Sequence, residues 1–475
     1  MLALHKVFNP RSIVFFGASN NPMTMGTGQL ASLIMAGFKG KIYPVHPSEE
    51  KVLGLEAYRS IVEIPEVPDL AVMVLPTRVV PAILDECGKA GVKAAVVVSG
   101  GFKEVGGDGA VLEREIKAIA LKYDITLIGP NCIGVSHFDI GLNTTYFPYE
   151  QKPGGVTIIS QSGTYSCHIY GFTKRMGIGL SHTVSVGNSA VVDITDCLEY
   201  FGNEPSTKAI ALYIEGIPDG QRFLRVACEA TKKKPVVALY VGGTDEGARA
   251  GLSHTGALAG DDAIYDGVFR AAGIVRAYDI EELLTWAWVF ATQPVPAGRR
   301  LCILSNSGGP AASMADRAAR MGLEVPVLSE KLQDQLRKVA PKTASVTNPV
   351  DLTFFMDVSS LYEKIPRMLC ASGEIDALVM YGIFGSYLFK KIAHGLSGRL
   401  DFPVENLMPF IVEMLEKLKE IPFEYGVPIV ASSFWGREDD ALDYLADAGV
   451  PVFPSPERAV DAVAALARMR EMRGL

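Results

Sequence analysis

The sequence predicts an α/β protein built from parallel sheets. Short apolar runs alternate with helical patterns from Ser12 to the end of the chain, as parallel strands joined by crossover helices require. A chain of 475 residues is too long for one hydrophobic core, so about three domains are expected. With 48% hydrophobic and 21% charged residues and no polar low-complexity tract, the chain is expected to be packed throughout.

The first predicted domain, residues 1–145, has strands separated by helical segments. Its candidate strands are Ile13–Phe16, Ile42–Val45, Leu70–Leu75, Ala94–Ser99 and Thr126–Ile128. Between them, the segment Val80–Ala90 has the spacing that places Ile83, Leu84 and Cys87 on one face of a helix. The polar, proline-containing segment Asn143–Gly155 then interrupts the pattern, and the domain boundary is placed there.

Two further domains are predicted, residues 146–296 and 297–475. The candidate strands of the second domain are Val156–Ser160, Thr183–Val186, Ala209–Ile214 and Val236–Tyr240, and its last helix is Ile280–Thr292. The segment Gln293–Arg300 has two prolines, one glycine and paired arginines, a composition typical of a linker. The third domain begins at Leu301 and repeats the order strand, glycine-rich loop, helix, which suggests that it shares its fold with the second.

Composition excludes several classes of protein. The formal net charge of −8 gives no electrostatic footprint for nucleic acid. The opening residues do not resemble a signal peptide and no segment offers the ~20 apolar residues of a bilayer crossing, so a cytoplasmic protein without membrane contact is expected. Seven cysteines are scattered singly, without CxxC pairs, which predicts neither a metal site nor a disulfide framework.

The turn after the first strand has the composition of a phosphate-binding loop. Gly17–Ser19 follows the strand, and Gly26 and Gly28 precede the next helical pattern. Glycines let the backbone approach a phosphate, and a helix N-terminus supplies N–H donors. A nucleotide-like ligand and a turn without ligand both fit. The spacing departs from GxGxxG, and the second strand ends without an acidic residue to hold a ribose, so NAD is disfavoured as the ligand. NAD stays an alternative because Glu49 and Glu50 follow a few positions later.

A second anion-binding loop is predicted at Ser160–Thr164. Here a buried strand runs into small and hydroxylated residues before a helical pattern, so N–H and hydroxyl donors could hold a phosphoryl group. An ordinary helix cap is the alternative. The segment Ser305–Gly309 repeats this arrangement in the third domain.

His254 and Glu215 are candidates for chemistry. Small residues flank His254 in the segment Gly251–Gly260, leaving room for a bulky adduct on a nucleophile. Glu215 ends an apolar strand, and the C-terminal tip of a parallel strand faces the crevice where α/β sheets bind ligands. There it could fix the tautomer of an imidazole. A structural histidine and an exposed loop glutamate are the alternatives.

Seven motifs in one order resemble the alpha subunit of ADP-forming acyl-CoA (acetyl-CoA) synthetases, which is related to the succinyl-CoA synthetase alpha subunit. They are GAS at 17–19, SGGF at Ser99–Phe102, GPNCIG at Gly129–Gly134, SQSG at Ser160–Gly163, VGN at Val186–Asn188, IEG at Ile214–Gly216 and SHTGALAG at Ser253–Gly260. The likeness covers essentially the whole chain. It implies a Rossmann-like CoA-binding domain followed by two flavodoxin-like, succinyl-CoA synthetase-like parallel-sheet domains.

The resemblance also implies a role for each site residue. His254 would carry a phosphoryl group, Glu215 would orient it, and Ser160, Gln161, Ser162, Gly163 and Thr164 would bind the phosphate. CoA would contact Gly17, Ser19, Pro22, Gly26, Val74, Pro76, Ser99, Gly100, Gly101 and Phe102, together with His46, which stands where the family usually has an asparagine. Pro130, Asn131, Cys132 and Asn188 would surround the acyl phosphate.

The implied reaction is acyl-CoA + ADP + phosphate ⇌ acid + CoA + ATP, through an acyl phosphate and a phosphohistidine. Nothing in the sequence resembles an ATP-grasp domain, which implies a separate beta subunit that holds ATP or ADP with Mg²⁺, in an α2β2 assembly. An NAD-dependent oxidoreductase and a non-enzymatic CoA-binding regulatory module are the alternatives.

Overall fold

The computed structural model describes residues 4–150, 152–247, 249, 260–385, 387–396, 399 and 407–474. Two compact units make up the chain. The first contains residues 1–174 and 179–283, and the second contains residues 175–178 and 284–475. The predicted nucleophile His254 lies outside the described residues.

The first sheet belongs to the N-terminal part of the first unit. It has five parallel strands in the order β2-β1-β5-β6-β7. Their bounds are β1 Ser12–Phe16, β2 Lys41–Val45, β5 Leu70–Met73, β6 Ala94–Val97 and β7 Thr126–Ile128. Every residue of β1, β5, β6 and β7 is buried, because crossover helices cover a parallel sheet on both faces. The strand order reverses between β1 and β5, the position where open α/β sheets bind ligands.

The second sheet of this unit has seven strands in the order β14-β13-β12-β10-β11-β8-β9. The bounds are β8 Val135–His137, β9 Leu142–Asn143, β10 Pro153–Ser160, β11 Leu180–Ser185, β12 Ala209–Ile214, β13 Val236–Tyr240 and β14 Val275–Ala277. Strands β8 and β9 are antiparallel additions at one edge, and the other strands are parallel. In the register of β10, Ser160 pairs with both Ser185 and Tyr213, so the loops after β10, β11 and β12 leave the sheet at the same edge.

The second unit contains a six-stranded sheet in the order β16-β17-β15-β18-β19-β20. The bounds are β15 Leu301–Ser305, β16 Ser345–Val346, β17 Val350–Asp351, β18 Ala377–Tyr381, β19 Ile429–Ser432 and β20 Val452–Phe453. All neighbours are parallel except β16 and β17. A two-stranded hairpin, β3 Lys51–Val52 and β4 Leu55–Glu56, projects from the first unit.

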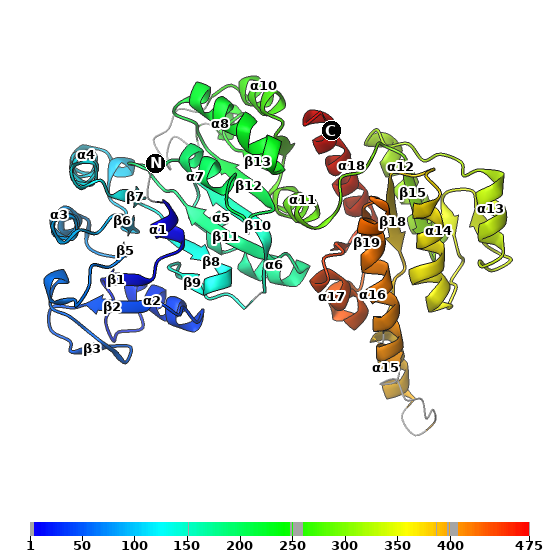
Figure 1. Ribbon diagram of the computed structural model, residues 1–475, viewed down its shortest axis with the longest axis horizontal. Coiled ribbons are helices and arrows are strands. Elements are labelled where there is room, and N and C mark those ends of the chain that lie inside the picture. Colours follow the sequence, from blue (N-terminus) through cyan, green and yellow to red (C-terminus); the bar gives the residue numbers. More distant parts are fainter. Residues whose placement is uncertain are drawn as a thin grey trace. The chain divides into compact units, whose positions relative to one another are not determined.

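Helices connect the strands within each unit, and Figure 1 shows the pairs α3 with α4 and α12 with α18 side by side. In the first unit the helices are α1 Leu4–Phe8, α2 Met25–Met35, α3 Val80–Ala90, α4 Gly107–Tyr123, α5 Thr164–Cys167, α6 Tyr170–Met176, α7 Ile194–Phe201, α8 Gly220–Lys233 and α10 Asp262–Ala272. Helix α11, Ile280–Thr292, leads into the second unit. The remaining helices are α12 Gly308–Arg320, α13 Glu330–Arg337, α14 Ile365–Ala371, α15 Tyr387–Gly395, α16 Leu407–Tyr425, α17 Asp440–Asp447 and α18 Pro456–Met472.

The predicted fold class is confirmed, since the three large sheets are built mainly of parallel strands joined by helices. The helices Val80–Ala90 and Ile280–Thr292 have their predicted bounds. One difference concerns the boundary between the first two domains. Strands β8 and β9 precede residue 146 but pair in the second sheet, so the domain limits 1–145, 146–296 and 297–475 remain predictions. In the described part of the chain, no helix has the length and apolar character needed to cross a bilayer.

Candidate functional site

A cavity of about 910 Å³ opens where the loops of the first unit's two sheets meet. The lining residues come from loops distant in sequence. They are Met25, Val98, Gly100, Lys103, Asn131, Cys132, Ile133, Gln161, Ser162, Gly163, Thr164, Cys167, His168, Gly187, Asn188, Ser189, Glu215, Gly216, Ile217 and Pro218. The volume lies within the range of small-molecule sites, roughly 300–1,000 Å³. The two predicted loops SQSG and IEG, and the GPN loop, therefore face one space.

Gln161 fixes the position of Glu215. Its side-chain Oε1 accepts hydrogen bonds from the backbone N–H groups of Glu215, at 2.6 Å, and Gly216, at 3.0 Å. Its Nε2 donates to the carbonyl oxygen of Gly216 at 2.8 Å. Each bond of this kind contributes about 0.5–1.5 kcal/mol net. The side chain of one predicted phosphate-loop residue thus holds the backbone that presents the predicted orienting carboxylate.

Ser160 holds the rest of the predicted phosphate loop in place. Its hydroxyl accepts from the N–H of Ser162 at 3.0 Å and donates to the carbonyl of the same residue at 2.7 Å. Ser160 itself is fully buried below the loop, while Gly163 and Thr164 line the cavity. The carbonyl of Thr164 accepts from the backbone N–H of His168 at 2.9 Å. The loop therefore turns into α5 with its small side chains directed to the cavity.

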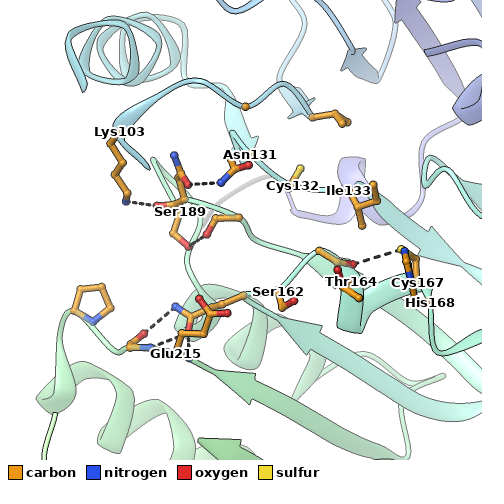
Figure 2. Close-up of a pocket in the computed structure, with 18 of the residues that line it drawn as sticks. Lys103, Asn131, Cys132, Ile133, Ser162, Thr164, Cys167, His168, Ser189 and Glu215 are labelled. Atoms are coloured by element: carbon orange, nitrogen blue, oxygen red, sulfur yellow. Dashed lines mark hydrogen bonds between the residues drawn. The ribbon is translucent and has the colours of Figure 1, made fainter. Parts of the chain in front are cut away.

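The opposite wall carries a polar network around Asn188. Its Nδ2 donates to Glu104 Oε2 at 2.6 Å and to Glu113 Oε2 at 2.8 Å, and its Oδ1 accepts from Asn131 Nδ2 at 3.2 Å. Lys103 Nζ donates to the backbone carbonyl of Asn188. Figure 2 shows Lys103 and Asn131 directed toward the turn that carries Ser189. This network therefore connects loops of the first sheet with the loop that follows β11 in the second sheet.

The charge state of Glu104 follows from this network. Burial would raise the pKa of its carboxyl group. Hydrogen bonds from Asn188 and from the backbone, including the N–H groups of Gly101 and Phe102, outweigh burial and hold the pKa below its usual value. Glu104 is therefore a carboxylate at neutral pH, and it orients the amide of Asn188.

Gly187 brings the two walls into backbone contact. A Cβ at this position would lie 2.3 Å from the carbonyl oxygen of Pro130, and the φ of Gly187 is 53°. A side chain there would push the 187–189 turn away from the GPN loop. Pro130 is buried beneath this contact, while Asn131 and Cys132 face the cavity.

Cys132 lies at the floor of the cavity as a thiol. Its Sγ donates to the carbonyl oxygen of Val97 at 3.3 Å, and burial raises its pKa to about 12. The thiolate is the nucleophilic form of cysteine, so the raised pKa makes Cys132 a poor nucleophile at neutral pH.

The predicted CoA residues gather around the β1 and β5 ends. The φ of Gly17 is 95°, and a Cβ there would meet the carbonyl oxygen of Val74 at 1.9 Å; at Gly26 it would meet the carbonyl oxygen of Gly17 at 2.1 Å. Only glycine allows helix α2 to approach the β1 turn this closely. The backbone N–H of Ser19 donates to Thr27 Oγ1 at 3.0 Å.

The other predicted CoA residues have different environments. Pro22, Pro76 and Gly100 are exposed. His46 Nδ1 accepts from the backbone N–H of Glu49 at 2.9 Å. Ser99 Oγ donates to the carbonyl oxygen of Leu75 at 2.5 Å. Gly101 has a φ of 92°. The ring of Phe102 is fully buried in the core and adds no surface to the cavity.

Both flanks of the segment that contains His254 are anchored near Glu215. The hydroxyl of Tyr240, at the end of β13, accepts from the N–H of Gly260 at 3.0 Å and donates to its carbonyl at 2.9 Å. Tyr240 stacks on Tyr265 with ring centroids 3.5 Å apart, and Tyr265 Oη accepts from the N–H of Ile217 at 3.1 Å. The chain therefore re-enters the described structure beside the loop of Glu215.

Sequence reasoning missed Lys103, Glu104, Glu113 and His168. The first three act through partners far along the chain, since Glu104 and Asn188 are 84 positions apart. One feature of the sequence could have identified Lys103 and Glu104: they directly follow the SGGF motif. The side chain of His168 is exposed and lines the cavity, where it packs edge-on against Phe147.

Comparisons with known families match both parts of the first unit. The family described as "CoA binding domain" matches residues 11–138. The family described as "Succinyl-CoA ligase like flavodoxin domain" matches residues 153–290. The first match ends at residue 138 and the second begins at residue 153, on either side of the predicted boundary between residues 145 and 146.

Two relatives that align with nearly the whole chain are named as ADP-forming CoA ligases, and the NAD-dependent oxidoreductase alternative finds no support. The chain is 38% identical over 468 residues to "Acetate--CoA ligase [ADP-forming] II subunit alpha" of Pyrococcus furiosus, with 98% of each chain covered. It is 34% identical over 471 residues to "4-hydroxybutyrate--CoA ligase [ADP-forming]" of Nitrosopumilus maritimus, covering 98% of this chain and 64% of that protein.

A solved structure is similar over nearly the whole chain. It is the "dinucleotide forming Acetyl-coenzyme A synthetase 1 in complex with phosphate and ADP" of Ca. Korarchaeum cryptofilum. The TM-score is 0.86 at 33% identity, with 99% of this chain and 97% of that chain covered. The similarity therefore extends through the second unit as well as the first.

Proposed function

Because this chain belongs to the family of the alpha subunits of ADP-forming acyl-CoA synthetases, we propose that it binds CoA and carries the phosphoryl group in such an enzyme. The reaction is acyl-CoA + ADP + phosphate ⇌ acid + CoA + ATP. The names of the two relatives above specify acetate and 4-hydroxybutyrate, so a small organic acid is the proposed substrate.

One observation supports this proposal most directly. The loop of Gln161, the strand-end carboxylate Glu215 and the amide of Asn131 line a single cavity. His254 lies six positions before Gly260, a span of at most about 20 Å in extended chain. Since Gly260 is tied through the Tyr240–Tyr265 stack to the loop of Glu215, His254 is proposed to reach Glu215 and the phosphate loop.

The first proposed step forms an acyl phosphate. A phosphate oxygen attacks the thioester carbonyl carbon. The carbon–sulfur bond breaks with its electron pair on sulfur, and sulfur takes up the proton that phosphate releases. Pro130, Asn131, Cys132 and Asn188 are proposed to surround this reaction. Asn131 and Asn188 are held by mutual hydrogen bonding, so their polar groups are positioned before the substrate arrives.

The second proposed step moves the phosphoryl group to His254. One imidazole nitrogen attacks phosphorus, the bond between phosphorus and the acyl oxygen breaks, and the acid leaves as its carboxylate. Glu215 accepts a hydrogen bond from the other ring nitrogen, which selects the reactive tautomer. The loop Ser160–Thr164 is the proposed resting place of the phosphoryl group. A helix dipole contributes only about 0.3–2 kcal/mol, so charge-assisted bonds of about 1.5–3 kcal/mol each supply the rest.

CoA is proposed to bind across the ends of β1 and β5. Gly17, Ser19, Pro22 and Gly26 would approach its phosphates, where Gly17 and Gly26 keep the backbone free of side chains. His46, Val74, Pro76 and the segment Ser99–Phe102 would line the remainder of the cleft, Phe102 through its backbone only.

The nucleotide half of the reaction is assigned to a partner. Relatives named as alpha subunits imply a separate beta subunit. We propose that this beta subunit is an ATP-grasp protein that holds ADP with Mg²⁺, in an α2β2 assembly located in the cytoplasm. Phospho-His254 would deliver its phosphoryl group there.

Phosphorylation of the isolated chain tests this proposal. Incubation with acetyl-CoA and inorganic phosphate is expected to add one acid-labile phosphoryl group, detected by intact mass. His254→Ala should abolish the gain, while His394→Ala, a control on α15 in the second unit, should retain it. Persistence of the phosphoryl group after His254→Ala would show that another residue is the carrier.

A further inference from the structure

Lys103 is the one lysine or arginine among the described residues that line the cavity. It begins the short turn Lys103–Val105, directly after the predicted CoA segment Ser99–Phe102. Its side chain is 43% exposed, so a ligand can reach the ammonium group. Neither the motifs of the sequence nor the proposed mechanism gives this residue a role.

The position of the Lys103 ammonium is fixed by two described partners. Nζ donates to the backbone carbonyl of Asn188 and lies 3.5 Å from Glu113 Oε1. An ammonium has three hydrogens, and the bond to the Asn188 carbonyl uses one of them, while Glu113 contributes an ion pair. Glu113 is only 8% exposed and is held by Asn188 Nδ2, so the anchor of Lys103 is itself rigid.

The charges of the cavity explain why a cation is needed here. Glu215 lines the cavity and contributes negative charge, and both phosphate and an acyl phosphate are anions. Asn131 and Asn188 supply dipoles but no positive charge. In the described lining, Lys103 is the one lysine or arginine, and it bonds the turn of Asn188, whose side chain accepts a hydrogen bond from Asn131.

We propose that Lys103 is a further catalytic residue, whose ammonium binds the phosphoryl group of phosphate and of the acyl phosphate. This inference rests on the function proposed above. Lys103 donates a hydrogen bond and transfers no proton. It offsets the charge of the attacking phosphate and holds the acyl phosphate against Asn131 until the histidine attacks phosphorus. The CoA phosphates are a second anionic source, and the experiment separates the two.

The test compares Lys103→Met and Lys103→Arg in the full chain. A matched control is Lys89→Met, which removes an exposed lysine of α3 paired with Asp85. Two equilibrium measurements are made with each variant in a His254→Ala background, so that no phosphoryl group is transferred. They use acetyl phosphate, followed by ³¹P NMR line broadening, and CoA, followed by calorimetry. A third measurement is the single-turnover rate of phosphorylation from acetyl-CoA and phosphate.

Lys103→Met should weaken acetyl phosphate binding at least tenfold and slow phosphorylation about 10²-fold, the effect typical of losing one preorganised donor. CoA affinity should change less than twofold. Lys103→Arg should recover part of both losses because it retains the charge, and Lys89→Met should match the unmodified chain.

Two outcomes would overturn the assignment. An equal loss of CoA and acetyl phosphate affinity would indicate that Lys103 binds the phosphates of CoA. Unchanged acetyl phosphate affinity would show that Lys103 does not bind the phosphoryl group. The proposed function fails separately: if the unmodified chain binds acetyl phosphate through Lys103 but His254 never becomes phosphorylated, the site stands and the phosphohistidine mechanism does not.

Discussion

At the scale of single residues, the site depends on side chains that fix the backbone of others. Gln161 accepts hydrogen bonds from the backbone N–H groups of Glu215 and Gly216. Ser160 bonds the backbone N–H and the backbone carbonyl of Ser162. These side chains hold the loops in place before a ligand binds, which reduces the entropy lost on binding. The proposed roles of Glu215 and His254 depend on this preorganisation.

Replacing Glu215 with glutamine tests its proposed orienting role. Glu215→Gln should slow phosphorylation by about 10²-fold or more, since general-base and orienting carboxylates contribute roughly 10²–10⁴. CoA affinity should remain unchanged because Glu215 lies on the loop after β12, in the second sheet, whereas the predicted phosphate contacts of CoA lie on the turn after β1, in the first sheet. Stopped-flow quench with mass detection and calorimetry measure the two quantities. Glu199→Gln, on α7, is the control, and parallel loss of both activities would indicate misfolding.

At the scale of elements, the loops at strand ends decide the site, and their glycines are steric requirements. Buried parallel strands were predictable to within a few residues because such strands are continuous apolar runs. Strands β8 and β9 were not predicted because they are short and contain the polar residues Ser136, His137 and Asn143, so neither forms an apolar run. The predicted helical stretch after SQSG is divided into α5 and α6, a break that composition alone does not reveal.

Two glycine substitutions separate backbone strain from steric contact. Gly17 has a φ of 95° and a Cβ position 1.9 Å from the carbonyl oxygen of Val74, whereas Gly54 has a φ of 82° and no heavy atom within 4 Å. Alanine at either site costs about 1–3 kcal/mol of strain. Only Gly17→Ala should also displace the β1 turn, with a lower melting temperature than Gly54→Ala and at least tenfold weaker CoA binding. Equal behaviour of the two variants would refute the steric argument.

At the scale of the whole molecule, the second sheet buries a stacked histidine pair. His137 and His182 are cross-strand partners on β8 and β11, with ring centroids 3.9 Å apart. Burial, and secondarily the neighbouring His137, lowers the pKa of His182 to about 2. In the unfolded chain the pKa is about 6.5, so the unfolded state binds an additional proton between these values.

This pKa difference predicts acid sensitivity. The stabilisation is fully present above about pH 6.5 and is lost by about 1.4 kcal/mol per pH unit as pH falls below that value. His182→Gln should therefore show a smaller drop in melting temperature between pH 7.5 and pH 5.5 than the unmodified chain. His394→Gln serves as the control. A pH dependence identical in all three proteins would contradict the assignment.

The sequence by itself determined the α/β class, the order of the motifs and the family, because these depend on local apolar runs and on short contiguous segments. The tertiary structure alone decided which loops face one another. Lys103 and Glu113 meet Asn188 across 85 and 75 positions of sequence, and Gln161 meets Gly216 across 55. Such contacts arise when two sheets pack and their loop ends are brought together, and a hydrogen bond between distant side chains leaves no periodicity in the chain.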